Sequence, residues 1–276
     1  MTFLFLVIGL VLVFDFINGF HDSANSIATV VSTKVLSPVA AVTMAAFFNF
    51  IAFLIFPLNV AHTMGKGVIN PDVVNLTVIA AALIAAISWN LLTWWYGLPS
   101  SSSHTLVGGL VGAAVASSGW SSVVMAGVIK IVIFIVIAPV LGMVMSFIIS
   151  AIVIFFARNH SPSGIDKHFR RLQLLSAAAF SLGHGGNDAQ KSMGIIWVAL
   201  IVSGLATKSD PIALWIVLSC QAAIALGTLL GGWRIVKTMG QKITKLKPFE
   251  GFCAESAGAI TLFGATHFGI PVSTTH

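Results

Sequence analysis

The sequence predicts an all-helical integral membrane protein built from two related halves that insert in opposite directions. Three observations predict this fold. Only 8% of the 276 residues are charged and 57% are hydrophobic, whereas a soluble protein has about 25% charged residues. Several apolar stretches are long enough to cross a bilayer. Two short polar motifs also occur twice, once in each half of the chain.

The apolar stretches predict the membrane helices. Near-continuous apolar residues fill the ranges 39–58, 73–95, 123–156 and 212–233. About 20 such residues cross a hydrocarbon core of roughly 30 Å as a helix. The period-two alternation of a β-barrel strand does not occur. Residues 3–14 are apolar without the basic start of a signal peptide, so we expect a first membrane helix that stays in the protein.

Each polar motif has a second copy later in the chain. Residues 18–26 align without gaps on residues 184–192, and residues 99–104 align on residues 271–276. The two pairs have nearly the same separation, which unrelated motifs would rarely share, and the segments between the motifs also correspond. The identical residues of the first pair are Gly19 and Gly185, Asp22 and Asp188, and Ser26 and Ser192.

The repeats predict how the chain is divided and oriented. We expect a first repeat over residues 1–157, a basic cytoplasmic loop over 158–171, and a second repeat over 172–276. About five spans per repeat is an odd number, so the second repeat is inverted relative to the first. The loop 234–247 is strongly basic, whereas its counterpart in the first repeat, the loop 59–72, has one Lys and one Asp, which places the former in the cytoplasm and the N-terminus outside. Inverted repeats with interrupted helices are typical of secondary transporters.

The second repeat is expected to be shorter than the first. In the first repeat, residues 105–157 supply two further spans after the Pro-Ser-His motif. In the second, the sequence ends at His276, the last residue of the equivalent motif. We therefore expect the second repeat to lack its last two spans.

Polar residues recur at three- and four-residue spacing in both copies of the first motif, which places them on one helix face. A carboxylate at membrane depth costs about 2.5–3.5 kcal/mol and persists where it meets a cation, a proton or water. Gly19 and the run Gly183, Gly185 and Gly186 predict local unwinding, with freed carbonyls available to a cation. The candidate coupling-ion residues are Asn18, His21, Asp22, Asn25, Asn187, Asp188 and, in another apolar span, Glu255.

The second motif is a run of hydroxyl residues between a proline and a histidine. Proline favours the first turn of a helix and Ser or Thr its cap, so exposed amides and hydroxyls gather there and favour an anion. Ordinary capping is the alternative. His104 and His276 either contact the anion, titrate, or are core histidines, and these readings stay open. Lys191 either pairs with Asp188 or contacts the anion. The candidate anion-binding residues are Ser101, Ser102, Ser103, Ser273, Thr274, Thr275 and Lys191.

Several function classes are disfavoured by the sequence. Neither GxGxxG nor a P-loop pattern occurs, so ATP-driven transport is not expected. No Cys/His cluster suggests a structural metal, and we expect no resident cofactor. Much of the net charge of +6 falls in two short loops, which indicates topology in a lipid membrane rather than nucleic-acid binding. An intramembrane hydrolase using Ser, His and Asp would need one asymmetric pair. The duplicated groups favour a protein that is not an enzyme.

Two segments resemble the inorganic phosphate transporter (PiT) family. Residues 183–194, Gly-His-Gly-Gly-Asn-Asp-Ala-Gln-Lys-Ser-Met-Gly, look like the full Gly-Asn-Asp signature of that family. The first copy, residues 16–26, has His21 where Asn is usual and resembles the bacterial low-affinity branch, in which Phe-His-Asp occurs. The Pro-Val-Ser-Thr-Thr-His end is also similar. The resemblance covers nearly the whole chain.

The resemblance implies symport of inorganic phosphate with sodium or protons. In the branch with His at this place it implies proton-coupled uptake of a divalent metal–phosphate complex, so the coupling cation is a proton or sodium. Some members carry sulfate, so a sulfate or other oxyanion permease is the alternative. We expect a multi-pass protein of the bacterial inner membrane. A homodimer is one of the arrangements left open.

Overall fold

The computed structural model describes residues 1–64, 67–158, 161–243 and 246–275. Within these ranges the chain is helical, without strands, apart from an isolated antiparallel bridge between Ile69 and Val123. This confirms the predicted all-α fold. The helices of residues 1–157 are α1 (Thr2–Ser32), α2 (Pro38–Ile51), α3 (Asn59–Met64), α4 (Leu76–Tyr96), α5 (Ser102–Ser118) and α6 (Met125–Ala157). Those that follow are α7 (Pro162–Val202), α8 (Leu214–Leu230), α9 (Trp233–Lys237) and α10 (Pro248–His267).

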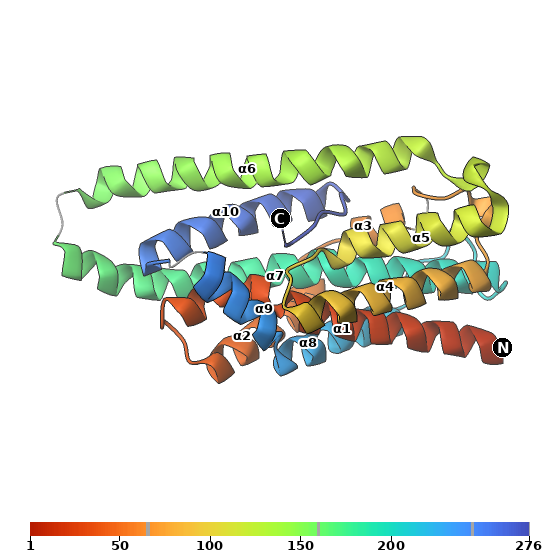
Figure 1. Cartoon of the computed structure of the whole chain (residues 1–276), viewed down its shortest axis with the longest axis horizontal. Helices are drawn as coiled ribbons and strands as arrows, with labels where there is room; N and C mark the ends of the chain where they lie inside the picture. The colour runs from red at the N-terminus through yellow and green to blue at the C-terminus, as the bar shows by residue number, and fades with distance from the viewer. Residues whose placement is uncertain (65–66, 159–160, 244–245, 276) are drawn as a thin grey trace.

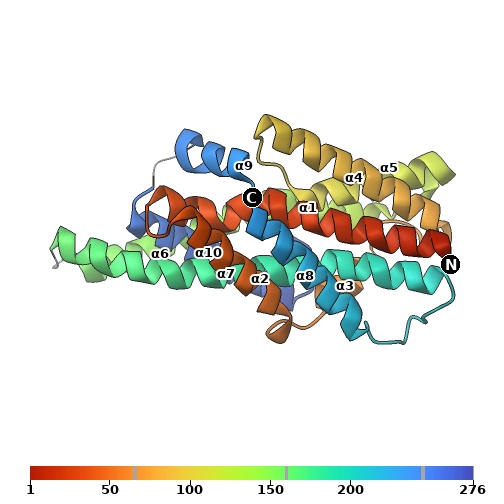
Figure 2. The ribbon, with the colours of Figure 1, turned by 90° about the horizontal axis from the view of Figure 1, so that it is seen from below.

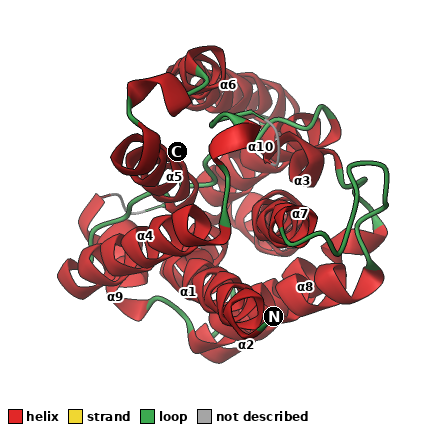
Figure 3. Cartoon of the chain, turned by 90° about the vertical axis from the view of Figure 1, so that its right-hand side faces the viewer, coloured by secondary structure: helices red, strands yellow, loops and turns green. Residues whose placement is uncertain are grey.

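Helices of membrane-spanning length and composition are present. Three described helices qualify, at Thr2–Ser32, Leu76–Tyr96 and Met125–Phe156, and Leu214–Leu230 with Trp233–Gly240 forms a fourth that is bent by 55°. The apolar window of α6 is entirely unburied within the protein, and α6 lies along one edge of the molecule (Figures 1 and 3). An apolar helix that faces outward is what a lipid environment requires.

The two helices that carry the first motif, α1 and α7, pass side by side through the interior (Figures 1 and 2). They run in opposite directions, since α1 starts at the end of the molecule where α7 finishes. α1 packs most extensively on α8, and α7 packs on α2. Each motif helix is therefore braced by a helix from the other half of the chain.

The predicted unwinding at the motif glycines is wrong. α1 and α7 are continuous through Gly19 and through residues 183–186. A Cβ added at Gly19 would lie 2.0 Å from the backbone oxygen of Ile224, and one at Gly185 would lie 2.4 Å from that of Asn49. These glycines allow α1 to touch α8 and α7 to touch α2, so they serve close packing rather than a break.

The helix interruptions occur in other elements. α2 ends in a short 3-10 turn, Ala52–Leu54, before Pro57, which disfavours a helical residue ahead of it. α8 ends at Gly231, which has a φ of 68°, and the chain turns sharply into α9. The amide of Gly232 then donates to Ser23 Oγ of α1 at 2.6 Å, so this break is tied to the motif helix.

Three segments predicted as loops are partly helical. Residues 162–171 of the basic segment 158–171 form the start of α7, after a Ser161 cap and Pro162. Residues 233–243 form α9 and a π-helical turn, and residues 59–64 form α3. Polar and basic residues predict a loop in each of these segments, but a helix that extends beyond a bilayer carries such residues as well. The repeat boundaries and their inverted insertion stay predictions.

Candidate functional site

The polar faces of α1 and α7 are buried against each other. On α1, Asp15, Asn18, Asp22 and Ser26 are each at most 2% exposed. On α7, the buried polar residues of the motif region include Ser181, His184, Asn187, Asp188, Lys191 and Ser192, also at most 2% exposed. Three- and four-residue spacing aligns these side chains on one helix face, as predicted. Polar groups buried to this degree need partners or ions.

The first carboxylate, Asp22, contacts two polar side chains. His21 Nδ1 lies 2.8 Å from Asp22 Oδ1, and the Ser102 hydroxyl at the start of α5 donates to Oδ2 at 3.1 Å. Ser101 caps α5, because its side chain accepts a hydrogen bond from the amide of His104. This confirms the predicted helix start, while the described part of residues 271–276 is not helical.

The second carboxylate, Asp188, lies in an equivalent setting with an added cation. The hydroxyl of Thr274 donates to Asp188 Oδ2 at 3.1 Å, and Lys191 Nζ lies 2.5 Å from Oδ1. His184 Nε2 is 3.2 Å from Oδ2. Ser102 and Thr274 occupy the same position of the aligned hydroxyl motifs, so each aspartate binds the equivalent hydroxyl of its own half.

The residues at positions 25 and 191, which also align, reach across to the other half. Asn25 donates to Thr275 Oγ1 at 3.1 Å and to Thr274 Oγ1 at 3.3 Å. Lys191 donates to Ser103 Oγ and to the Val272 carbonyl, the latter at 2.8 Å. The two hydroxyl motifs thereby meet in one place, since Ser103 also donates to the Val272 carbonyl.

His21 and Asn187 occupy equivalent positions of the two motifs, and each hydrogen bonds with a threonine of another helix in its own half. His21 Nε2 lies 3.1 Å from Thr93 Oγ1 of α4, and the Asn187 amide donates to Thr266 Oγ1 of α10 at 3.0 Å. Asn187 also donates to the Ile270 carbonyl and accepts from the Val272 amide. Its polar atoms are thus engaged by the segment that leads into the second hydroxyl motif, which positions that segment.

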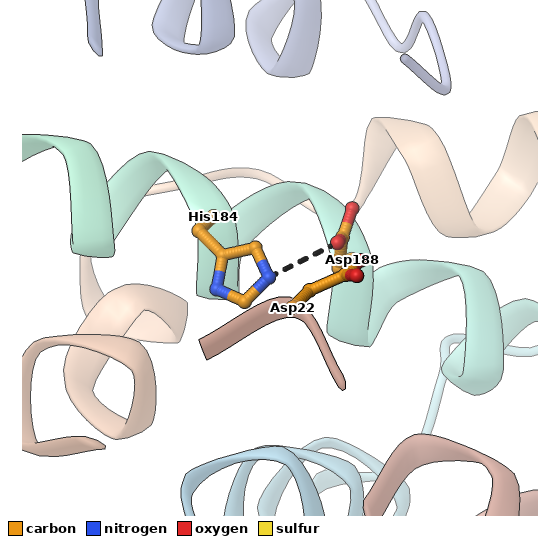
Figure 4. A group of neighbouring side chains, drawn as sticks. All are labelled: Asp22, His184 and Asp188. Atoms are coloured by element: carbon orange, nitrogen blue, oxygen red, sulfur yellow. Dashed lines mark ion pairs between the residues drawn. The ribbon is translucent and has the colours of Figure 1, made fainter. Parts of the chain in front are cut away.

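Three ligand atoms of Asp22, His184 and Asp188 lie within 4.8 Å of one another (Figure 4). Two buried carboxylates and an imidazole in this geometry offer a cation both oxygen and nitrogen ligands. His184 was not among the predicted coupling-ion residues, although its four-residue spacing from Asp188 places both on one helix face. His184 Nδ1 lies 3.3 Å from Asn49 Oδ1, so α2 orients the ring.

Other predicted residues lie beside the cluster or apart from it. Glu255 accepts hydrogen bonds from Thr29 and, at 2.5 Å, from Ser176. It shares a cavity of about 280 Å³ with Asn25 and residues 273–275, and among the described residues its hydrogen bonds go to Thr29, Gln173 and Ser176 rather than to either aspartate's neighbours. His104 is half-buried and lines an open groove between α4 and α5. His276 lies outside the described residues.

A helical membrane protein whose buried charges and hydroxyls meet between two halves is a transporter by class. In a comparison with known families, the model described as "Phosphate transporter family" matches residues 18–164 and 156–276 of this chain. The chain belongs to this family, as the resemblance of its motifs predicted.

Individual relatives agree with this assignment. A "Probable low-affinity inorganic phosphate transporter" of Rhizobium meliloti (strain 1021) is 58% identical over 274 residues, covering 98% of this chain and 82% of the relative. One of the same description from Bacillus subtilis (strain 168) is 46% identical with the same coverage. A solved structure described as "The sodium-dependent phosphate transporter" is 26% identical, with a TM-score of 0.90 over 100% of this chain and 87% of that one.

Proposed function

We propose that this chain carries inorganic phosphate across a membrane by secondary active transport coupled to protons or sodium. One observation carries the proposal: two buried aspartates and two hydroxyl motifs, one of each from either half, converge on one site. Membership of the phosphate transporter family supports phosphate as the substrate. The convergence supports coupling, because cation and anion ligands lie within one hydrogen-bonded network.

Phosphate would bind at the hydroxyl motifs. The start of α5 lies within the first hydroxyl motif, and the dipole of this helix favours an anion at its N-terminus. Lys191 adds a fixed positive charge beside Ser103. The proposed phosphate ligands are the hydroxyls of Ser101, Ser102, Ser103, Ser273, Thr274 and Thr275 together with Lys191. Ser101 Oγ accepts from the His104 amide and keeps its own proton for a phosphate oxygen, whereas the Ser102 and Thr274 hydroxyls would have to turn away from Asp22 and Asp188.

Coupling follows from charge. Asp22 and Asp188 repel a bare phosphate dianion, but a cation held between them and His184 attracts it. Each ligand then raises the affinity for the other, which coupling requires. A divalent cation fits two carboxylates and an imidazole as well, so the same cluster supports entry of phosphate as a metal complex. In that case the metal is cargo.

Alternating access would arise from rocking of one half against the other. The opposite directions of α1 and α7 support an inverted repeat (Figures 1 and 2). The contacts of Asn25 and Lys191 with the opposite half support a binding site where the halves meet. The N-terminus would lie outside a bacterial inner membrane, by the charge of the loops.

Uptake of radiolabelled phosphate into liposomes, with sodium and proton gradients imposed separately, tests this function. We expect accumulation above the external concentration only when an inward cation gradient is present. Accumulation that is independent of both gradients would show a passive channel instead. Unlabelled sulfate added in excess separates the main alternative, because a sulfate permease would lose labelled phosphate uptake and a phosphate carrier would keep it.

Removing one equivalent hydroxyl from each half should weaken phosphate binding by a similar amount. A hydrogen bond to a charged group contributes about 1.5–3 kcal/mol, so we expect Ser102→Ala and Thr274→Ala each to raise the phosphate KM by about tenfold or more. Ser118→Ala, at the exposed far end of α5, is the matched control. If neither Ser102→Ala nor Thr274→Ala alters KM, phosphate binds elsewhere.

A further inference from the structure

The polar stripe of α1 contains a carboxylate that the proposed mechanism does not use. Asp15 precedes Asp22 by seven residues, which is about 10 Å along a helix axis. Its side chain is fully buried, and it faces the Ser192 hydroxyl of α7 and the Cys220 thiol of α8. It therefore lies beside the central cluster, between the same two motif helices.

Oxygen atoms around Asp15 have no hydrogen bond of normal geometry. This holds, among the described residues, for both carboxylate oxygens of Asp15, for Asn18 Oδ1 and for Ser192 Oγ. Asn18 follows Asp15 by three residues and so lies on the same helix face. Buried oxygens without a full set of partners are costly, and here the groups that face the Asp15 carboxylate as donors are a neutral hydroxyl, Ser192, and a neutral thiol, Cys220.

The charges nearby do not neutralise Asp15. The charged groups that act on it are Asp188 and Lys191 of α7. Lys191 is already paired with Asp188 at 2.5 Å and donates to the Val272 carbonyl. The Cys220 thiol is only a weak donor. A cation that pairs with Asp15 alone would therefore come from outside the chain.

The second half contains no equivalent carboxylate. In the alignment of the motifs, Ser181 stands opposite Asp15. Its hydroxyl donates to the Ala177 carbonyl at 2.8 Å, so it is satisfied within α7. A cation bound at Asp15 would thus be additional to any cation held by the equivalent residues Asp22 and Asp188.

We propose that Asp15, Asn18 and Ser192 form a second cation site, which takes up one small monovalent cation in each transport cycle. This inference rests on the proposed function. An all-oxygen set of carboxylate, amide carbonyl and hydroxyl suits sodium, and the same carboxylate accepts a proton. Both provide the one positive charge that this site lacks.

The phosphate accumulation ratio measures the number of coupled cations. Wild type and Asp15→Asn in liposomes are given a tenfold inward sodium gradient or a tenfold inward proton gradient, with the membrane voltage held at zero. One coupled cation fewer should lower the steady-state ratio of internal to external phosphate about tenfold. A drop only under the sodium gradient identifies sodium, and a drop only under the proton gradient identifies a proton.

Controls separate the possible failures. Asp72→Asn, at an exposed carboxylate, should leave the ratio unchanged. Ser192→Ala removes a neutral ligand and should raise the cation concentration needed for half-maximal uptake, so it carries the test if Asp15→Asn does not fold. Wild-type ratios in Asp15→Asn, or an unchanged cation dependence in Ser192→Ala, overturn the second site. Failure of wild type to accumulate phosphate at all overturns the proposed function instead.

Discussion

Asp188→Asn should reduce gradient-driven phosphate uptake at least about 100-fold. The substitution leaves the Lys191 ammonium, now 2.5 Å from Asp188 Oδ1, buried without a counter-charge. Removing one partner of a buried ion pair costs about 3–5 kcal/mol, and each 1.4 kcal/mol is about a factor of ten. It also removes a ligand from the cluster with Asp22 and His184. Initial rates in liposomes under an inward cation gradient measure the effect.

Two further variants separate transport from folding. Asp188→Asn/Lys191→Gln removes both charges together, so it should recover folded protein but not transport. Asp22→Asn should also abolish coupled uptake, although no lysine is left unpaired there. The exposed Asp72→Asn is the matched control. Normal, gradient-driven uptake in both Asp22→Asn and Asp188→Asn would contradict the proposed role of the aspartates.

Gly19→Ala should destabilise the protein by at least about 1–3 kcal/mol, the usual cost of overpacking a tight contact. The added Cβ would lie 2.0 Å from the Ile224 backbone oxygen. Because that neighbour is backbone, relief requires α1 and α8 to separate. Thermal unfolding of the detergent-solubilised protein, followed by size exclusion, measures the loss.

Gly9→Ala is the matched control for this prediction, because it makes the same change on the same helix. Gly9 is exposed and a Cβ there meets nothing within 4 Å. We expect no loss of stability. Equal melting temperatures for Gly19→Ala and wild type would mean that α1 and α8 do not cross in backbone contact.

The helices and the aspartates were predictable from the sequence, because both depend on local patterns. Apolar length predicts α4 and α6, and three- and four-residue spacing predicts the polar faces of α1 and α7. The repeat alignment predicts that Asp22 and Asp188 have equivalent surroundings, and their bonds to Ser102 and Thr274 agree. The functional roles of these residues stay predictions.

Features that depend on which helices touch were not predictable. A glycine that permits a close crossing and one that breaks a helix look alike in sequence, so Gly19 and Gly185 were misread. The inclusion of His184 in the cluster with Asp22 depends on how α1 lies against α7. The polar atoms of Asn187 are engaged by Thr266 and the chain beyond it, a contact between distant segments that spacing along one helix does not reveal.

The contacts around the aspartates sort into two kinds, those within a half and those between halves. Asp22–Ser102 and Asp188–Thr274 each join residues of the same half, whereas Asn25–Thr275 and Lys191–Ser103 bridge the two. If the halves move as rigid bodies, the distances within a half, Asp22–Ser102 and Asp188–Thr274, stay the same through the transport cycle. The distances between halves, Asn25–Thr275 and Lys191–Ser103, change. A distance probe across positions 25 and 275 would then report the conformational state, and one across 22 and 102 would serve as its internal standard.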